Sequence, residues 1–116
     1  MTQIQDLTEQ QLNTLAALGQ GWRIQMKGGY FVDKSYTPCT NWSQAGELVE
    51  KYSIAIVPPE LSGLENWAAG STHHYTGKQG RDNEQAKTPL LAIVRAFVAS
   101  VYGTEVDYDA IVGGDV

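Results

Sequence analysis

The fold of this 116-residue chain is decided by residues 88–103, which read TPLLAIVRAFVASVYG. Thr88 is a suitable N-cap, Pro89 fits the first helical position, and Gly103 provides a stop. Leucine, isoleucine, valine and phenylalanine recur at helical spacing around nearly the whole stretch. A helix that is apolar on almost every side is typical of the central element of a small core. We therefore expect the other elements to pack around this helix.

The rest of the chain predicts two shorter helices and four strands. Apolar residues spaced three or four apart after a capping side chain indicate the helices, and alternating large and polar residues around a Gly-Gly turn indicate a hairpin. We expect one small antiparallel sheet packed by the central C-terminal helix and the two shorter helices, which makes the fold class α+β. The predicted elements are helices over Asp6–Leu18 (N-cap Thr8) and Trp42–Lys51 (N-cap Thr40 or Asn41), a hairpin over 22–32, and strands over 54–57 and 65–69.

The length of the chain suits one domain, because 116 residues can bury one core but not two. We expect a single domain over 1–116, with a folded core over 5–106. Residues 70–87 form a long polar stretch, which we interpret as a loop. Residues 107–116 carry three acids and no base, and we expect them to be a mobile acidic tail.

The charge balance excludes several classes of partner. Eight Lys and Arg against thirteen Asp and Glu give a net charge of −5 and a pI near 4.8. General nucleic-acid binding needs a clustered basic surface, so we do not expect it.

The apolar run Leu90–Tyr102 contains Arg95 and is too short to cross a bilayer, and the first ten residues do not resemble a secretory signal. With Cys39 as the one cysteine, no internal disulfide is possible, and we expect a cytosolic protein.

Three separated blocks of sequence carry a family resemblance. They read YTPCTNWSQAGELVEKYSI at 36–54, WAA at 67–69 and TPLLAIVRAFVASVYGTEV at 88–106. In order and spacing they resemble the phage NinX-like family of small bacteriophage and prophage proteins, and the resemblance covers 36–106. It implies a phage accessory protein in the cytoplasm of a host bacterium, but it implies no activity. Cys39 stands where relatives usually carry a small serine.

The candidate binding residues are aromatic rings, helix starts and one isolated arginine. Aromatic faces near helix N-termini suit a nucleobase and a phosphate, because the ring stacks while the helix dipole attracts the anion. Arg95 is surrounded by apolar residues, so it must reach water, pair with a carboxylate, or bind an anionic ligand. The rings could equally be core residues. The predicted ligand-binding residues are Tyr36, Thr40, Asn41, Trp42, Trp67, Thr88 and Arg95.

Gly46 is an unexpected residue within the predicted helix over 42–51. Glycine disfavours a helix interior relative to alanine, and close approach of another backbone or of a ligand would explain it. Glu47 and Glu50 fall on the predicted solvent face and are most simply solubility charges.

These residues support one main hypothesis and two alternatives. We expect a homo-oligomeric phage protein that sequesters a small nucleotide-derived immune signal, of the cyclic ADP-ribose or cyclic-nucleotide type, with no catalytic residue, cofactor or metal; this rests on analogy. One alternative is a phosphodiesterase, because His74 and Thr76 form one half of the motif of two-histidine phosphodiesterases, whose second half is missing from the chain. The other alternative is a protein–protein inhibitor of a host factor, with the aromatic rings forming a surface patch.

Overall fold

A computed structural model of the chain describes residues 1–21, 24–26, 29–31, 36–62, 65–71 and 84–113. Helices and small antiparallel sheets make up the fold, which is α+β as predicted. In chain order the elements are β1 (Thr2–Gln3), the 3-10 helix η1 (Ile4–Asp6), α1 (Glu9–Gly19), β2 (Ile24–Met26), β3 (Gly29–Phe31), α2 (Trp42–Tyr52), β4 (Ile54–Val57), α3 (Pro59–Ser62), β5 (Trp67–Ser71), β6 (Glu84–Ala86), α4 (Pro89–Tyr102), β7 (Glu105–Val106) and α5 (Tyr108–Gly113).

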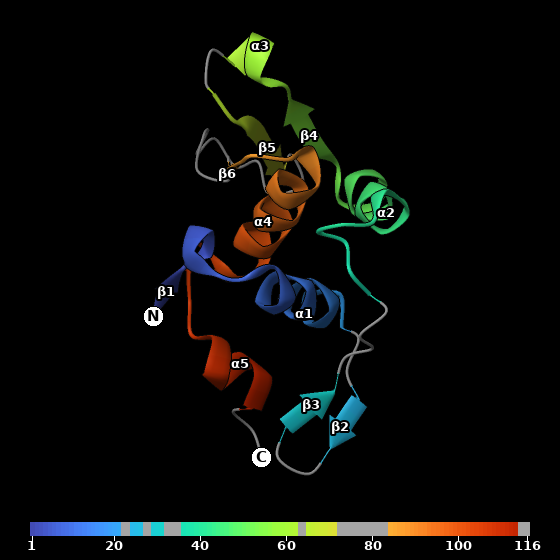
Figure 1. Ribbon diagram of the computed structural model, residues 1–116. Coiled ribbons are helices and arrows are strands. Elements are labelled where there is room, and N and C mark those ends of the chain that lie inside the picture. The colour runs from blue at the N-terminus through green and yellow to red at the C-terminus, as the bar shows by residue number, and fades with distance from the viewer. Residues whose placement is uncertain (22–23, 27–28, 32–35, 63–64, 72–83, 114–116) are drawn as a thin grey trace.

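The helix α4 is the centre of the core, as its apolar sequence predicts (Figure 1). Thr88 caps it, because its Oγ1 accepts a hydrogen bond of 3.2 Å from the backbone N–H of Leu91. The helix contacts α1, α2 and the three strands β4, β5 and β6. Buried residues occupy most of its circumference: Leu90, Ala92, Ile93, Val94, Ala96, Phe97, Val98 and Ala99.

One of the apolar residues of α4 is not part of the core. Val101 is 41% exposed. It lies beside Gly19, at the end of α1, where an added Cβ would be 3.5 Å from Cγ2 of Val101 and 3.2 Å from Cε2 of Phe97. Glycine therefore allows α1 to approach Phe97 closely, and it also leaves Val101 without a covering side chain.

The helix α1 begins with a capping box. The backbone N–H of Thr8 donates to Oε1 of Gln11 at 2.9 Å, and the backbone N–H of Gln11 donates to Oγ1 of Thr8 at 3.1 Å. Two otherwise unpaired N–H groups are thus satisfied. Leu12 and Leu15 are fully buried, which confirms the predicted stripe.

The helix α2 leads directly into β4. Of the two expected caps, Asn41 is the one observed, and its Oδ1 accepts a hydrogen bond of 3.2 Å from the N–H of Gln44. The helix ends at Ser53, which adopts a left-handed conformation with φ of 54°. A single residue therefore turns the chain from α2 into the strand.

The expectation of one sheet is wrong within the described residues, where the strands form three separate antiparallel sheets. β2 and β3 pair with each other, with Ile24 opposite Phe31, and lie away from the strands that pack on α4 (Figure 1). The main sheet has the order β4-β5-β6. Its third strand, β6, lies inside the stretch 70–87 that the sequence predicts as a loop. The sequence does not indicate this strand, because the pairing of Ala86 with Trp67 depends on a neighbour distant in sequence.

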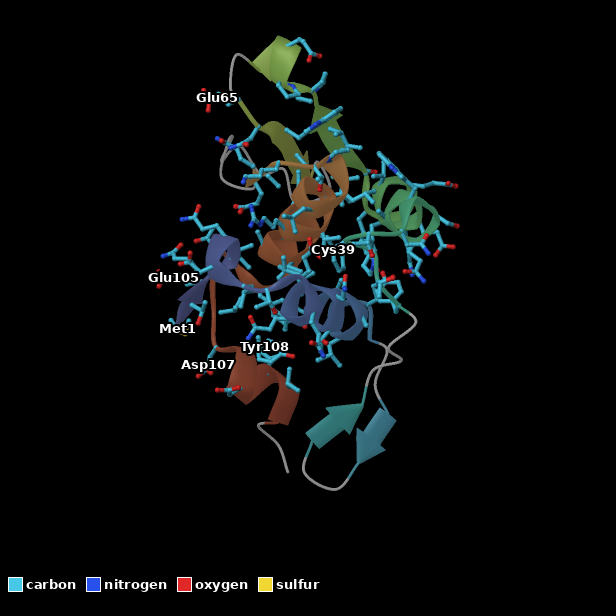
Figure 2. The ribbon with its side chains drawn as sticks, in the orientation of Figure 1. Met1, Cys39, Glu65, Glu105, Asp107 and Tyr108 are labelled. Atoms are coloured by element: carbon cyan, nitrogen blue, oxygen red, sulfur yellow. The ribbon has the colours of Figure 1, made fainter. Side chains whose placement is uncertain are left out.

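The first strand pairs with a short strand late in the chain, and the segment that follows it differs from the prediction. β1 pairs with β7, and Thr2 lies opposite Val106. Residues 108–113 of the expected mobile tail form the helix α5 instead, and Tyr108 and Ile111 pack against the core. Figure 2 shows Tyr108 pointing from α5 towards α1. Two apolar residues three positions apart on one helix face are enough to hold this segment on the core.

Candidate functional site

Arg95 connects three elements that are distant in the sequence. Its Nη1 donates a hydrogen bond of 2.6 Å to the carbonyl oxygen of Gln85 in β6, and its Nη2 donates one of 3.2 Å to that of Gln5 in η1. The side chain is partly buried, and it extends back towards the start of α4, as side chains on helices do. Its Nε is buried, and it has no hydrogen-bond partner among the described residues.

Arg95 lines a cavity of about 630 Å³. The cavity lies where the start of α4 meets β6, η1 and the first turn of α1. Its described lining is mainly polar, with two cations, two carboxylates and three side-chain amides. The lining residues are Gln5, Glu9, Asn66, Glu84, Gln85, Ala86, Lys87, Thr88, Leu91 and Arg95.

The charges in the cavity are mixed. Lys87 and Arg95 are positive, and the helix dipole adds partial positive charge at the start of α4. Glu9 and Glu84 are negative. Such a lining can bind a small molecule that carries an anionic group and also several hydrogen-bond donors. It does not suit a long polyanion, because the carboxylates repel the additional phosphates.

Two of the seven predicted binding residues line this cavity, namely Thr88 and Arg95. The prediction that aromatic rings converge on the arginine is not borne out by this lining, because Tyr36, Trp42 and Trp67 do not belong to it. Trp67 is partly buried and packs against the core. Trp42 is 58% exposed at the start of α2.

The other predicted residues have structural roles. The hydroxyl of Tyr36 accepts a hydrogen bond of 2.7 Å from Nε2 of Gln20, and burial raises the pKa of Tyr36 above its ordinary value although this bond opposes the shift. Thr40 donates from Oγ1 to the carbonyl oxygen of Thr37 at 3.4 Å. Asn41 caps α2. These three residues organise the chain between α1 and α2.

Cys39 lies in the core below the first turn of α1. The residue is 3% exposed. Its thiol donates a weak hydrogen bond of 3.8 Å to the carbonyl oxygen of Glu9, and its backbone N–H donates to Oδ1 of Asn13 at 3.0 Å. Burial, reinforced by the negative charge of Glu9 and opposed by Arg95, raises the pKa of this thiol from 9.0 to about 12. The thiol is therefore protonated and poorly reactive at neutral pH.

Sequence reasoning missed most of the cavity. Gln5 and Glu9 come from the first ten residues, and Glu84 and Gln85 come from a strand that was predicted as loop. The sequence carries no local signal that these residues lie next to Arg95, since Gln5 and Arg95 are 90 positions apart. Thr88 and Arg95 are the lining residues that the sequence did indicate, as the cap of a predicted helix and as an isolated charge within it.

The residues of the enzyme alternative, His74 and Thr76, lie outside the described residues. Within the described part of the chain, no group of three or more histidine, cysteine or acidic side chains could hold a metal ion. No helix there has both the length and the apolar character needed to cross a membrane.

Taken together, the fold and the cavity define a small α+β protein with a polar pocket at the start of its central helix. The family model described as "Bacteriophage P22, NinX" matches residues 4–101, so this chain belongs to the phage NinX family. The match confirms the resemblance and extends it from residue 36 back to η1, which helps to line the cavity. Among curated proteins, none matches the chain.

Proposed function

We propose that this phage protein binds and sequesters a small nucleotide-derived signal, of the cyclic ADP-ribose or cyclic-nucleotide type, without cleaving it. The observation that carries the proposal is Arg95, which lines the cavity and whose Nε–H is buried without a hydrogen-bond partner among the described residues. A buried donor of this kind is costly unless an acceptor reaches it, and a ligand phosphate is a suitable acceptor.

The size and the rigidity of the cavity support the proposal. Its volume of about 630 Å³ is typical of pockets for small molecules. The two carbonyl oxygens that hold Nη1 and Nη2 of Arg95 fix the direction of the guanidinium before any ligand arrives. Preorganisation of this kind raises affinity, because less freedom is lost on binding.

The remaining polar groups suit the rest of a nucleotide. Lys87 adds a second cation for a pyrophosphate. Glu9 and Glu84 can accept hydrogen bonds from ribose hydroxyls or from a base amine. Since no aromatic ring belongs to the described lining, we expect recognition through charge and hydrogen bonds and not through stacking.

Titration calorimetry with cyclic ADP-ribose and with a cyclic dinucleotide tests the proposal. Arg95→Ala and Lys87→Ala are each expected to weaken binding by about tenfold or more, since each removes a charge-assisted contact. Lys87 is exposed, so its variant tests the site without disturbing the core. Lys51→Ala is the matched control, because it removes a cation from α2, outside this cavity. Unchanged affinity in both cavity variants would remove the proposal.

Chromatography of the ligand after heat denaturation separates capture from catalysis. Sequestration returns the intact ligand, whereas a phosphodiesterase that uses His74 and Thr76 returns cleavage products. We further propose that the protein acts as a homo-oligomer in the cytoplasm of the host bacterium. Light scattering across a concentration series measures the oligomeric state, and a monomer at all concentrations contradicts that part of the proposal.

A further inference from the structure

The outer face of α2 carries an exposed tryptophan that the cavity does not use. Trp42 is 58% exposed in the first turn of the helix. A side chain of this size and apolar character is costly to leave in water, and tryptophan is enriched among the residues that dominate protein–protein binding energies. Its exposure therefore suggests a contact with another molecule.

Gly46 lies one helical turn after Trp42 on the same side of α2. A Cβ added there would meet nothing within 4 Å. Packing within the described chain thus gives no reason for glycine at a position where alanine would favour the helix. Close approach of an outside backbone does give a reason, since glycine exposes the helix surface directly.

The charge around this pair of residues is mainly negative. Glu47 and Glu50 are exposed, and with Lys51 they line an open hollow of about 410 Å³ on the same helix. The ammonium group of Lys51 lies 5.5 Å from the ring centre of Tyr52, in a cation–π contact. Among the described residues neither carboxylate forms an ion pair, so both can meet an incoming cation.

We infer that this surface, made by Trp42, Gly46, Glu47 and Glu50, docks a basic amphipathic helix of a partner protein. The partner helix lays small and apolar side chains against Trp42 and Gly46, and it places lysine or arginine side chains against the two glutamates. A nucleic acid does not suit the surface, because its phosphates meet two carboxylates. A second copy of this chain does not suit the surface either, because it brings two more glutamates and a net charge of −5 to the same place.

The test follows Trp42 directly by ¹⁹F NMR of the full chain labelled with 5-fluorotryptophan, with the three resonances assigned by tryptophan-to-phenylalanine variants. The probes are two synthetic amphipathic helical peptides with the same alanine and leucine face, one flanked by lysines and the other by glutamates. We expect the lysine peptide to shift the Trp42 resonance saturably and the glutamate peptide to leave it unchanged. No shift with the lysine peptide, or equal shifts with both, would overturn the inference.

Variants identify the surface and exclude unfolding as a cause. Gly46→Leu fills the approach to the helix and is expected to weaken peptide binding at least tenfold, although its thermal midpoint stays the same or rises because leucine favours a helix. The double variant Glu47→Lys with Glu50→Lys is expected to abolish binding. Its control, Glu105→Lys with Asp107→Lys, changes the net charge equally on the edge of the molecule opposite α2 (Figure 2). Peptide binding that survives the first two variants contradicts the assignment.

Dilution of the labelled protein alone tests whether the occupant of this surface is a second copy of the chain. A concentration-dependent Trp42 shift that disappears in Gly46→Leu would show that α2 binds itself, and it would overturn the inference. The α2 variants lie outside the Arg95 cavity and are expected to leave nucleotide binding unchanged, so this surface and the proposed function fail or succeed separately.

Discussion

Replacing Cys39 with serine is expected to make the folded protein less sensitive to alkaline pH. Cys39 is 3% exposed, and the pKa of its thiol is raised from 9.0 to about 12 in the fold. Folding therefore stabilises the protonated form. The contribution of this group to stability is fully present below pH 9, falls as the unfolded chain begins to lose the proton, and is lost as the pH rises through about 12.

The magnitude follows from the two pKa values. At pH 10 the unfolded chain has mostly lost the proton while the folded chain keeps it, so the free energy of unfolding of the wild type falls by roughly 1–2 kcal/mol relative to pH 8. A serine hydroxyl does not ionise in this range and can donate to the same carbonyl oxygen of Glu9. Tyr36, whose pKa is also raised, is present in both proteins, so the main part of its effect, which comes from burial, cancels in the comparison, and the last of its causes, the charge of Cys39, does not.

Urea unfolding at pH 8 and at pH 10, followed by circular dichroism, measures this difference. The expected result is a larger alkaline loss of stability in the wild type than in Cys39→Ser, by roughly 1–2 kcal/mol. Equal losses in the two proteins would refute the reasoning, because they would mean that the thiol ionises as easily in the fold as in the unfolded chain.

Three further predictions concern the stability of the fold, and chemical denaturation measures each. Thr8→Val removes the side-chain cap of α1 and is expected to destabilise the protein by about 1 kcal/mol, so no change would contradict the capping box. Ile93→Val, at a fully buried position, is expected to lower stability by about 0.5–1.5 kcal/mol. Val101→Ala should have the smaller effect of the two, and the reverse order would contradict the packing of α4. Gly103→Ala places a side chain at φ of 88° and is expected to lower stability by about 1 kcal/mol or more, whereas unchanged stability would argue against this backbone conformation.

The helices could be predicted from the sequence because their signals are local. Thr8, Asn41 and Thr88 each cap a helix a few residues away, and the apolar spacing within each helix is read over the same short range. The strands were less predictable. β6 and β7 are only three and two residues long, and each exists because of a partner elsewhere in the chain, which no local pattern shows.

The candidate site could be predicted only in part, for the same reason. From its apolar neighbours, Arg95 was expected to reach water, pair with a carboxylate or bind an anionic ligand, and the structure instead gives its Nη atoms two backbone carbonyl oxygens. The sequence did not show that those partners are backbone carbonyl groups of η1 and β6. The prediction placed Trp42 beside an anion site because it stands at a helix start, but position along a helix does not determine which way the first turn faces.

The pairing of β1 with β7 has a consequence for biosynthesis. A ribosome that has released residues 1–86 holds a chain that lacks α4, the element on which α1, α2 and the main sheet all pack. The N-terminal segment must then wait until residues 105–106 leave the exit tunnel before its own strand can pair. Folding of this protein is therefore expected to finish after translation of most of the chain, because the packing on α4 and the pairing of β1 with β7 join residues that are far apart in the sequence.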